Sequence, residues 1–276
     1  MSGRTMIVIG IGSDIGAEAA RRFAADGWSV KGTYRGATAP SNMPAGAGLT
    51  RCELNSREST ATALRWLRRE ADPWDAIVVA AGTEEPIGEF WNCDADEWEN
   101  GFQVNALAPL RLVRGLYPAR RRDGSPSVAF FSGSGTNNAA PSYSAYCASK
   151  ILLIKMCELL DAESSDTGFF IIGPGIVRTK IHQQTLVAAN RSGANYRKVA
   201  DFLESTEPGT SHEDIYACIR WCMNAGKNVV GGRNISLVHD AWRNGGKALA
   251  SQLEADRNLY KLRRFGNEAQ IGDGRK

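Results

Sequence analysis

Short apolar runs and longer amphipathic stretches alternate along the chain. The run at residues 76–81 has the length and the β-branched content of a strand that is buried on both faces. Strand-like segments that alternate with helix-like segments are typical of βαβ units and a parallel sheet. The pattern predicts strands at residues 6–10, 28–34, 49–54, 76–81, 126–131, 168–173 and 234–238, and helices at residues 15–26, 56–71, 105–122 and 212–224 and around Tyr146.

Two other segments lack a clear period. Residues 180–207 are polar and interrupted, which predicts a mobile substrate lid rather than core structure. Residues 241–276 form a C-terminal extension with a helical middle, in which the basic run at residues 261–264 is expected to be a solvated helix face rather than a binding patch. We therefore expect an α/β fold, a Rossmann-type doubly wound parallel sheet, in a single domain of residues 1–240 followed by this extension.

The composition changes this picture little. A hydrophobic fraction of 43% with 23% charged residues is ordinary for a globular protein, and 276 residues are enough for one large α/β domain. A net charge of +3 is too small to indicate a nucleic-acid partner. Apolar runs stay far below the roughly 20 residues that a membrane span needs, and the chain enters its first strand without a signal-like segment.

The cysteines and histidines lack the spacing of metal ligands. The six cysteines are scattered, and the three histidines are not paired with them. We expect no metal site, and reduced, mostly buried thiols in a cytoplasmic protein.

A glycine-rich turn separates the first predicted strand from the first predicted helix. Three glycines within seven residues let backbone N–H groups approach a pyrophosphate at a helix N-terminus. A tight strand-to-helix turn without a ligand is the alternative, because Ile15 stands where the usual dinucleotide fingerprint has its third glycine. The predicted contacts are Gly10, Gly12, Ser13, Asp14, Ile15 and Gly16.

The end of the second strand indicates which dinucleotide would bind. An Asp or Glu there would accept hydrogen bonds from the adenosine ribose, but the chain has Tyr34 and Arg35. The planar guanidinium group of Arg35 suits a 2′-phosphate, unless it is only an exposed loop residue. NADP is therefore favoured over NAD.

Tyr146 and Lys150 lie four residues apart, one turn of a predicted buried helix. A phenol with a pKa near 10 is a poor acid or base at neutral pH, and a nearby cation lowers that pKa. The pair is thus a candidate general acid and its activating cation. Such a spacing is common by chance, so its weight depends on the rest of the chain.

The strand, the glycine turn and Tyr-x-x-x-Lys, in this order, resemble the short-chain dehydrogenase/reductase family over roughly residues 5–240. The family's glycine motif falls on Gly10, Asp14 and Gly16; Asp14 replaces the middle glycine, or instead caps the helix. The family's Asn-Asn-Ala-Gly resembles residues 79–82, which keep Ala-Gly and lose both asparagines.

The resemblance implies further site residues. Asn105 matches the asparagine that holds a catalytic water in many members, and residues 174–179 match Pro-Gly-x-Val-x-Thr, whose backbone contacts the nicotinamide carboxamide and whose threonine contacts the diphosphate. Glu53, followed by Leu54, falls at the position where the family usually has an Asp near the adenine of the cofactor. The implied cofactor contacts are Glu53, Leu54, Ala80, Ala81, Gly82, Tyr146, Lys150, Pro174, Gly175, Ile176, Val177 and Thr179.

The catalytic serine of the family is the most ambiguous assignment. It usually lies about 13 residues before the tyrosine, and that position is Gly133 here. Ser132 and Ser134 flank it, and Ser134 is favoured because it lies beyond the strand end. Trp91, Tyr143 and His182 are candidate walls of the substrate pocket.

Together the resemblance implies an NAD(P)-dependent oxidoreductase that interconverts a secondary alcohol and a carbonyl, with Tyr146 as the general acid or base. Lys150 would lower the pKa of the phenol and bond the nicotinamide ribose. A homodimer or homotetramer is expected, as is common in the family. Two alternatives stay open: a catalytically silent NAD(P)-binding sensor, and a sugar-modifying member that acts on a nucleotide-linked or polysaccharide precursor.

Overall fold

A seven-stranded parallel sheet forms the centre of the protein, as seen in a computed structural model that describes residues 3–264. The strand order is β3-β2-β1-β4-β5-β6-β7, and all neighbouring strands pair in parallel. This confirms the predicted Rossmann-type doubly wound α/β fold. The strands are β1 (Thr5–Ile9), β2 (Ser29–Tyr34), β3 (Gly48–Arg51), β4 (Ala76–Val79), β5 (Ser127–Phe131), β6 (Gly168–Gly173) and β7 (Asn234–Ser236).

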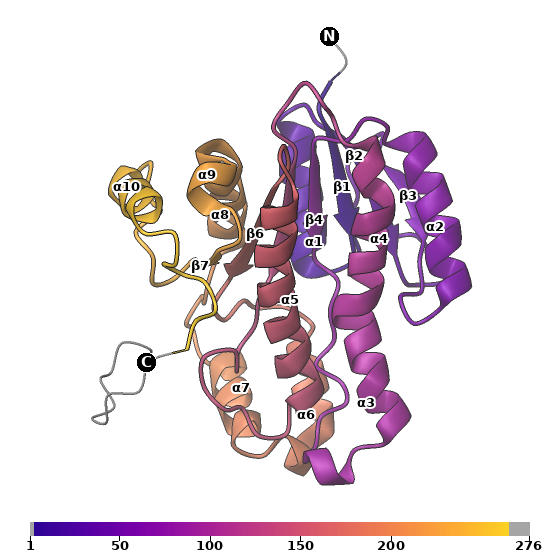
Figure 1. Ribbon diagram of the computed structural model, residues 1–276. Coiled ribbons are helices and arrows are strands. Elements are labelled where there is room, and N and C mark those ends of the chain that lie inside the picture. The colour runs from indigo at the N-terminus through magenta and orange to yellow at the C-terminus, as the bar shows by residue number, and fades with distance from the viewer. Residues whose placement is uncertain (1–2, 265–276) are drawn as a thin grey trace, which may run out of the picture.

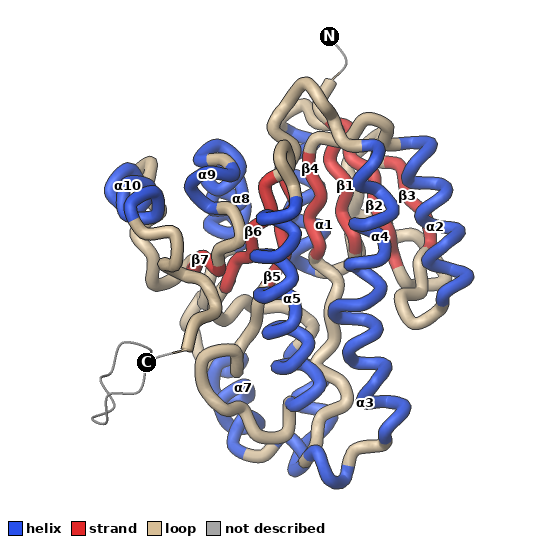
Figure 2. Tube along the Cα trace, in the orientation of Figure 1, coloured by secondary structure: helices blue, strands red, loops and turns tan. Residues whose placement is uncertain are grey.

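Helices cover both faces of this sheet, so that the strands form a middle layer (Figure 2). Along β1, Met6 and Val8 join a core cluster that contains Phe23, whereas Ile7 and Ile9 join a second cluster that contains Leu67. This alternation follows from the period of two in a strand. The first face carries α1 (Asp14–Ala25), α8 (His212–Ala225), α9 (Lys227–Val230) and α10 (Lys247–Ala255), and the second carries α2 (Arg57–Glu70), α4 (Ala108–Leu116) and α5 (Ser144–Glu163).

The helix predicted at residues 105–122 is wrong at both ends. The structure has α3 (Ala95–Phe102), a π-helical turn η2 (Gln103–Leu107), α4 and a short 3₁₀ turn η3 (Tyr117–Ala119). Asp94 caps α3 by accepting a hydrogen bond from the backbone N–H of Glu97. α3 is only eight residues long, and Ala95, Trp98 and Phe102 are too few apolar positions for the pattern to reveal it. A second short 3₁₀ turn, η1 (Phe90–Asn92), precedes it.

Residues 180–207 are helical for most of their length, which their irregular pattern did not predict. They form α6 (His182–Ala188), a 3₁₀ turn η4 (Ala189–Ser192) and α7 (Ala194–Glu204). These helices lie beyond the carboxyl ends of the strands (Figure 1). Arg178 ties them to the segment after β6, because its guanidinium group donates to the carbonyl oxygens of Phe202, Leu203, Ser205 and Glu207 at the end of α7.

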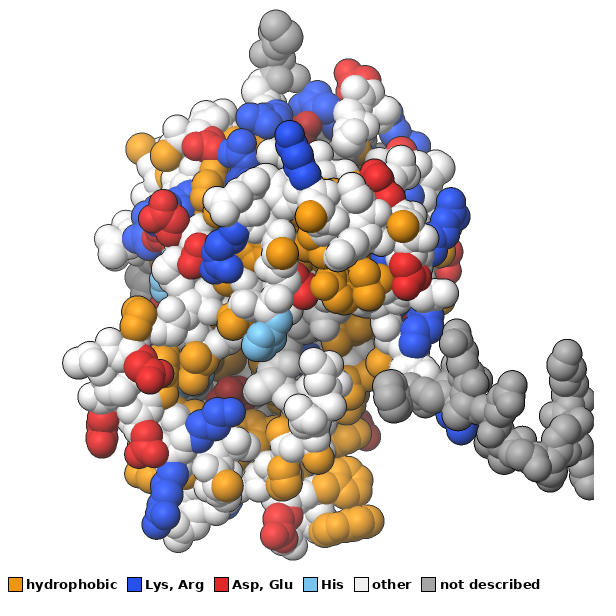
Figure 3. All heavy atoms as spheres, turned by 90° about the vertical axis from the view of Figure 1, so that its left-hand side faces the viewer, with side chains coloured by type: hydrophobic (Ala, Val, Ile, Leu, Met, Phe, Trp, Pro, Cys, Tyr) orange, Lys and Arg blue, Asp and Glu red, His pale blue; other side chains and the backbone are white. Residues whose placement is uncertain are grey.

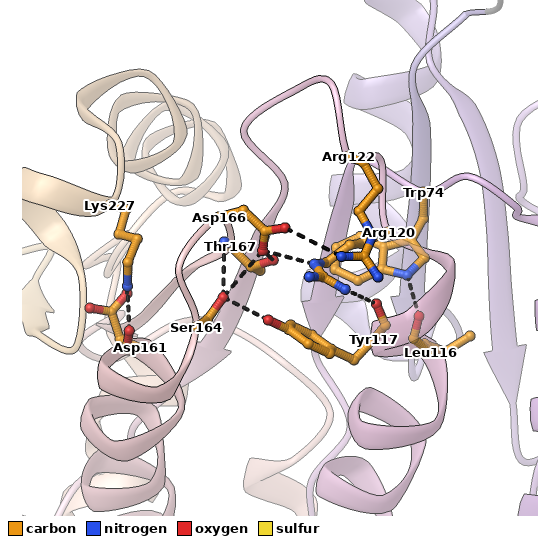
Figure 4. A network of polar contacts seen from close by, with 10 residues as sticks. All are labelled: Trp74, Leu116, Tyr117, Arg120, Arg122, Asp161, Ser164, Asp166, Thr167 and Lys227. Atoms are coloured by element: carbon orange, nitrogen blue, oxygen red, sulfur yellow. Dashed lines mark hydrogen bonds and ion pairs between the residues drawn. The ribbon is translucent and has the colours of Figure 1, made fainter.

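A buried polar network joins the loops at the opposite, amino end of the sheet (Figure 4). The guanidinium group of Arg120 donates to Asp166 Oδ1 at 2.8 Å and to the carbonyl oxygen of Tyr117 at 2.9 Å. The hydroxyl groups of Tyr117 and Ser164 share a hydrogen bond of 2.9 Å. The network therefore links the end of α4 to the end of α5 on the side away from the strands' carboxyl ends.

The C-terminal extension packs on the first face through α10, whose Leu249 and Leu253 are buried. Arg233, which is 3% exposed, holds it: the guanidinium group donates to the carbonyl oxygens of Leu253, Asp256 and Leu259. The basic run at residues 261–264 lies outside any helix, contrary to expectation, because α10 ends at Ala255. The rest of the extension, residues 265–276, lies outside the described part of the chain.

Positive and negative side chains are mixed on the face seen in Figure 3 and form no continuous basic patch there. Within residues 3–264, no helix is long and apolar enough to cross a membrane.

Substitution of Arg233 tests whether its hydrogen bonds stabilise the packing of the C-terminal extension on the domain. Arg233→Met should lower the free energy of unfolding by about 2–4 kcal/mol, because three charge-assisted hydrogen bonds to buried carbonyl groups are lost. Denaturant unfolding measures this loss, and Arg257→Met, at an exposed arginine on the same extension, is the matched control. Equal losses in the two variants would contradict the role of Arg233.

Candidate active site

The candidate site lies at the carboxyl ends of β1, β4, β5 and β6. The strand order reverses between β1 and β4, and such a switch point leaves a crevice at the carboxyl ends of the strands. The glycine turn follows β1, Gly82 follows β4, Gly133 follows β5 and Pro174 follows β6. The structure therefore brings most of the predicted site segments to one edge of the sheet.

Tyr146 and Lys150 are both buried on the first turns of α5. Lys150 Nζ donates to the carbonyl oxygen of Phe131 at 3.0 Å and lies 5.6 Å from the centre of the Tyr146 ring. Burial lowers the pKa of Lys150 to about 8, because it disfavours the charged form.

The pKa of Tyr146 moves in the direction opposite to the expected one. Burial raises it well above its ordinary value, and the neighbouring Glu84 and Cys147 raise it further. The ammonium group of Lys150, which donates to the carbonyl oxygen of Phe131, does not outweigh these effects. The phenol therefore stays protonated at neutral pH in this arrangement.

Asn105 lies in the π-helical turn η2 and is fully buried. Its Oδ1 accepts from the backbone N–H of Thr83 at 2.8 Å, and its Nδ2 donates to the carbonyl oxygen of Thr83 at 2.9 Å and to Ser149 Oγ at 3.1 Å. A Cβ at Gly82 would lie 3.5 Å from Asn105 Oδ1 and 3.8 Å from Lys150 Nζ. Asn105 thus joins the loop after β4 to α5 beside Lys150, and a π turn at such a position is common in functional sites.

Neither candidate serine contacts the phenol of Tyr146 through a hydrogen bond within residues 3–264. Ser132 Oγ donates to Asn234 Oδ1 at 3.1 Å, toward β7, and the side chain of Ser134 is exposed. A Cβ at Gly133 would overlap the hydroxyl oxygen of Tyr146. The phenol group thus fills the space that a side chain at position 133 would need.

The glycine turn is packed too closely for side chains. A Cβ at Gly10 would lie 2.6 Å from the backbone nitrogen of Ala81, and a Cβ at Gly16 would collide with the carbonyl oxygen of Gly10. Ser13, not Asp14, caps α1: its Oγ accepts from the backbone N–H of Gly16 at 3.0 Å. Asp14 is the first residue of α1, which leaves its carboxylate free for another partner.

That partner is Lys180, at the start of the lid. Asp14 Oδ2 accepts from the backbone N–H of Lys180 at 2.7 Å, and Lys180 Nζ donates to the carbonyl oxygen of Gly12 at 2.6 Å. The ammonium group lies 3.8 Å from Asp14 Oδ1. The unusual carboxylate in the glycine turn is thus compensated by a cation.

A cleft of about 480 Å³ opens beside this turn. Gly12 and Ser13 line it together with the basic side chains of Arg21, Arg178 and Lys180. Glycines, a helix N-terminus and cations are groups that suit a pyrophosphate. Two carboxylates, Asp14 and Glu18, also line the cleft, and each is paired with one of these cations. No group of three or more His, Cys, Asp or Glu residues within residues 3–264 could hold a metal ion.

The remaining predicted cofactor residues lie around the same edge. Arg35 is exposed directly after β2, and Tyr34 is 3.8 Å from the place of a Gly12 Cβ. Glu53 pairs with Arg51 at 3.0 Å. The other predicted positions are Leu54, half-buried against the second-face cluster, Ala80 and Ala81 after β4, and Gly175, Ile176, Val177 and Thr179 in the segment that joins β6 to the lid.

The lid contacts the loop after β4 through polar side chains that the pattern did not single out. Gln184 Oε1 accepts from the backbone N–H of Glu84 at 2.7 Å. Thr185 Oγ1 donates to Glu84 Oε2 at 2.8 Å and shares a hydrogen bond of 2.7 Å with the hydroxyl group of Tyr143. In the sequence, Glu84 cannot be told apart from its neighbour Glu85. The one signal that could have identified Glu84 as a site residue is its position two residues after Gly82.

The three residues predicted to line the substrate pocket differ in their contacts and in their exposure to solvent. Tyr143 lies in one apolar cluster with Ile87, Tyr146, Cys147 and Ala188. His182 bonds the carbonyl oxygen of Val177 through Nε2 at 2.8 Å. Trp91 is 87% exposed and takes no part in the cluster.

Comparison with known proteins gives one family. The family model described as "short chain dehydrogenase" matches residues 4–189. An uncharacterised oxidoreductase of Schizosaccharomyces pombe is 29% identical over 105 residues, which cover 38% of this chain and 42% of that protein. The chain thus spans less than two thirds of this relative, and 56% of a second oxidoreductase of the same yeast.

Two further similarities cover more of the chain. A protein of Escherichia coli named cyclic-di-GMP-binding biofilm dispersal mediator is 26% identical over 224 residues, 80% of this chain and 89% of that protein. The solved structure of a short-chain dehydrogenase/reductase of Saccharomyces cerevisiae matches with a TM-score of 0.75 at 18% identity, covering 90% of this chain and 99% of that one. At this identity the structural match supports the fold alone.

Proposed function

Because the chain belongs to the short-chain dehydrogenase/reductase family, a family of oxidoreductases that use NAD(P), we propose that it interconverts a secondary alcohol and a carbonyl compound. The observation that carries the proposal is the burial of Tyr146 and Lys150 together, next to Asn105 and the glycine turn. Such a group of a phenol, an ammonium and an ordering amide has an evident use in proton transfer.

In this proposal the nicotinamide supplies the hydride chemistry, and the chain supplies the proton and the orientation. Tyr146 donates its proton to the carbonyl oxygen during reduction and accepts it in the reverse direction. The raised pKa of the phenol, caused mainly by burial, favours the protonated form that reduction requires. Lys150 stabilises the phenolate that is left, and Asn105 holds the loop after β4 in place beside it.

The cofactor is proposed to be NADP rather than NAD. Arg35 is exposed at the end of β2, where the 2′-phosphate of a bound adenosine would lie, and Glu53 is already paired with Arg51. Gly10, Gly12, Ser13 and Gly16 would hold the pyrophosphate, and residues 174–179 the nicotinamide side.

We also propose a cytoplasmic homodimer or homotetramer whose catalytic domain is residues 1–240. The unpaired thiols, of which all but Cys93 are buried, support a reducing compartment. Partly exposed apolar side chains on η2 and α5, namely Leu107, Ile151 and Leu159, are suited to contact a second copy.

A catalytically silent binding protein is the second candidate. Gly133 at the expected serine position and Asp14 in the glycine turn favour it, and one relative has a name that refers to nucleotide binding rather than to a reaction. A sugar-modifying member stays the third candidate; it rests on the sequence of the tail, in which Leu259 and Tyr260 pack on the chain's own core.

Tyr146→Phe tests the proposed function. The turnover number for carbonyl reduction should fall by about 10³-fold, because the proton donor is removed, while the dissociation constant for NADPH stays within about twofold. Steady-state kinetics and a fluorescence titration measure the two. The matched control is Tyr117→Phe, which removes the same atom at the amino end of the sheet and should keep full activity.

Equal turnover in wild type and Tyr146→Phe would contradict the mechanism. Binding of NADPH without hydride transfer to any compound of a broad panel of aldehydes and ketones would support the silent binding protein instead.

Arg35→Ala tests the cofactor preference. The dissociation constant for NADPH should rise about tenfold or more, because a charge-assisted hydrogen bond to the 2′-phosphate is lost, whereas that for NADH should not change. The control is Arg57→Ala, an exposed arginine at the start of α2. Tighter binding of NADH than of NADPH by the wild type would contradict the proposed preference for NADP.

A further inference from the structure

We propose that Glu84 recognises a hydroxyl group of the substrate next to the reacting carbon, so that the substrate is a hydroxylated carbonyl compound or its polyol. This inference rests on the proposed function, because it assigns a substrate class to the same site.

Glu84 is placed at the site by contacts from two sides. It follows Gly82 by two residues, on the loop that Asn105 holds through Thr83. From the other side the lid contacts its backbone through Gln184 and its carboxyl group through Thr185. The side chain is only 8% exposed, which is rare for a carboxyl group.

The carboxyl group of Glu84 bonds a polar side chain of α6 that in turn contacts the apolar cluster around Tyr146. Tyr146 belongs to the cluster of Ile87, Tyr143, Cys147 and Ala188, and Tyr143 contacts Thr185, the hydrogen-bond partner of Glu84. Thr185 thus connects Glu84 to the side chains around Tyr146, and the nearby carboxyl group of Glu84 is, after burial, one of the causes that raise the pKa of Tyr146. A substrate oxygen bonded to Tyr146 would therefore have Glu84 close to the adjacent atoms.

The carboxyl group has an unused hydrogen-bonding capacity. Within residues 3–264, Thr185 is the one donor to it, through Oε2, although a carboxylate can accept about four hydrogen bonds. A buried carboxyl group with so few partners is unfavourable, and a substrate hydroxyl group would supply the missing donor. A ketone without a hydroxyl group would cover the carboxyl group of Glu84 without supplying a hydrogen-bond donor.

A hydroxyl group fits this position better than an ammonium group. Burial raises the pKa of Glu84, because it disfavours the charged form, and an ammonium group in the same site would lose its own hydration as well, a cost that a neutral hydroxyl group avoids. A hydroxyl group can bond to either protonation state of the carboxyl group. Gly133, which lies against the phenol oxygen, has no side chain to contact such a substituent.

The test compares reduction of 2-hydroxycyclohexanone and cyclohexanone with NADPH. The wild type should prefer the hydroxylated compound by at least about tenfold in kcat/KM, since a site built to bond a hydroxyl group rejects the analogue that lacks it. In Glu84→Ala this preference should disappear, mainly through a higher KM for the hydroxylated compound. Glu84→Gln, which keeps the size and one acceptor oxygen, should retain part of it.

The matched control is Glu85→Gln, which removes the charge of the exposed neighbour and should keep the wild-type preference. An NADPH titration of each variant checks that the fold is intact. An unchanged preference in Glu84→Ala, a wild type that favours cyclohexanone, or a stronger preference for 2-aminocyclohexanone would each overturn the inference. If any of these three outcomes occurs while ketones are still reduced, the role of Glu84 is wrong and the proposed function stands. If no carbonyl compound accepts a hydride, the proposed function and the role of Glu84 are both wrong.

Discussion

The burial of the Lys150 ammonium group is the constraint on which the candidate site depends. An ammonium group taken out of water is costly unless hydrogen bonds compensate it. Here the carbonyl oxygen of Phe131 accepts from it, and Asn105 makes two hydrogen bonds to Thr83 of the neighbouring loop and one to Ser149 of α5. The same burial that lowers the pKa of Lys150 raises that of Tyr146, so the pair is a protonated phenol beside a cation that loses its charge easily.

The predicted lid, residues 180–207, covers Tyr146 through Ala188 and is joined to the glycine turn. Arg178 binds the carbonyl groups at the end of α7, and Lys180 bonds both Asp14 and Gly12 of the glycine turn. On the substrate side, Gln184 and Thr185 of α6 contact Glu84. The segment from residue 174 to residue 185 therefore connects the glycine turn, the proposed place of the dinucleotide, to Glu84, the proposed contact of the substrate.

The sheet could be predicted from the sequence because a strand buried on both faces needs an uninterrupted apolar run, as at residues 76–81. The glycine turn was visible because close packing against Ala81 excludes any side chain at Gly10. The helices at residues 182–204 were not visible, because α6 is only seven residues long and α7 buries only Val199 and Phe202, too few apolar positions to set a period. The π turn at Asn105 was also hidden, because it depends on contacts with Thr83 and Ser149 that are distant in sequence.

The chemistry of the site was predictable only in part. A phenol and an ammonium one helical turn apart suggested a lowered phenol pKa, but burial outweighs the cation here. No spacing rule could decide between Ser132 and Ser134, because the decisive fact is that the phenol of Tyr146 packs against Gly133. Likewise, only the fold distinguishes the buried Glu84 from the exposed Glu85.

The central claim, that a buried Lys150 supports proton donation by Tyr146, is tested most directly by the pH dependence of kcat/KM for carbonyl reduction. The profile should fall above about pH 8, where Lys150 loses its proton, because Tyr146 keeps its own proton well beyond that pH. Lys150→Arg, whose guanidinium group stays charged, should retain some activity and lack this falling limb. A wild-type profile that stays flat to about pH 10, or one that Lys150→Arg leaves unchanged, would contradict the account.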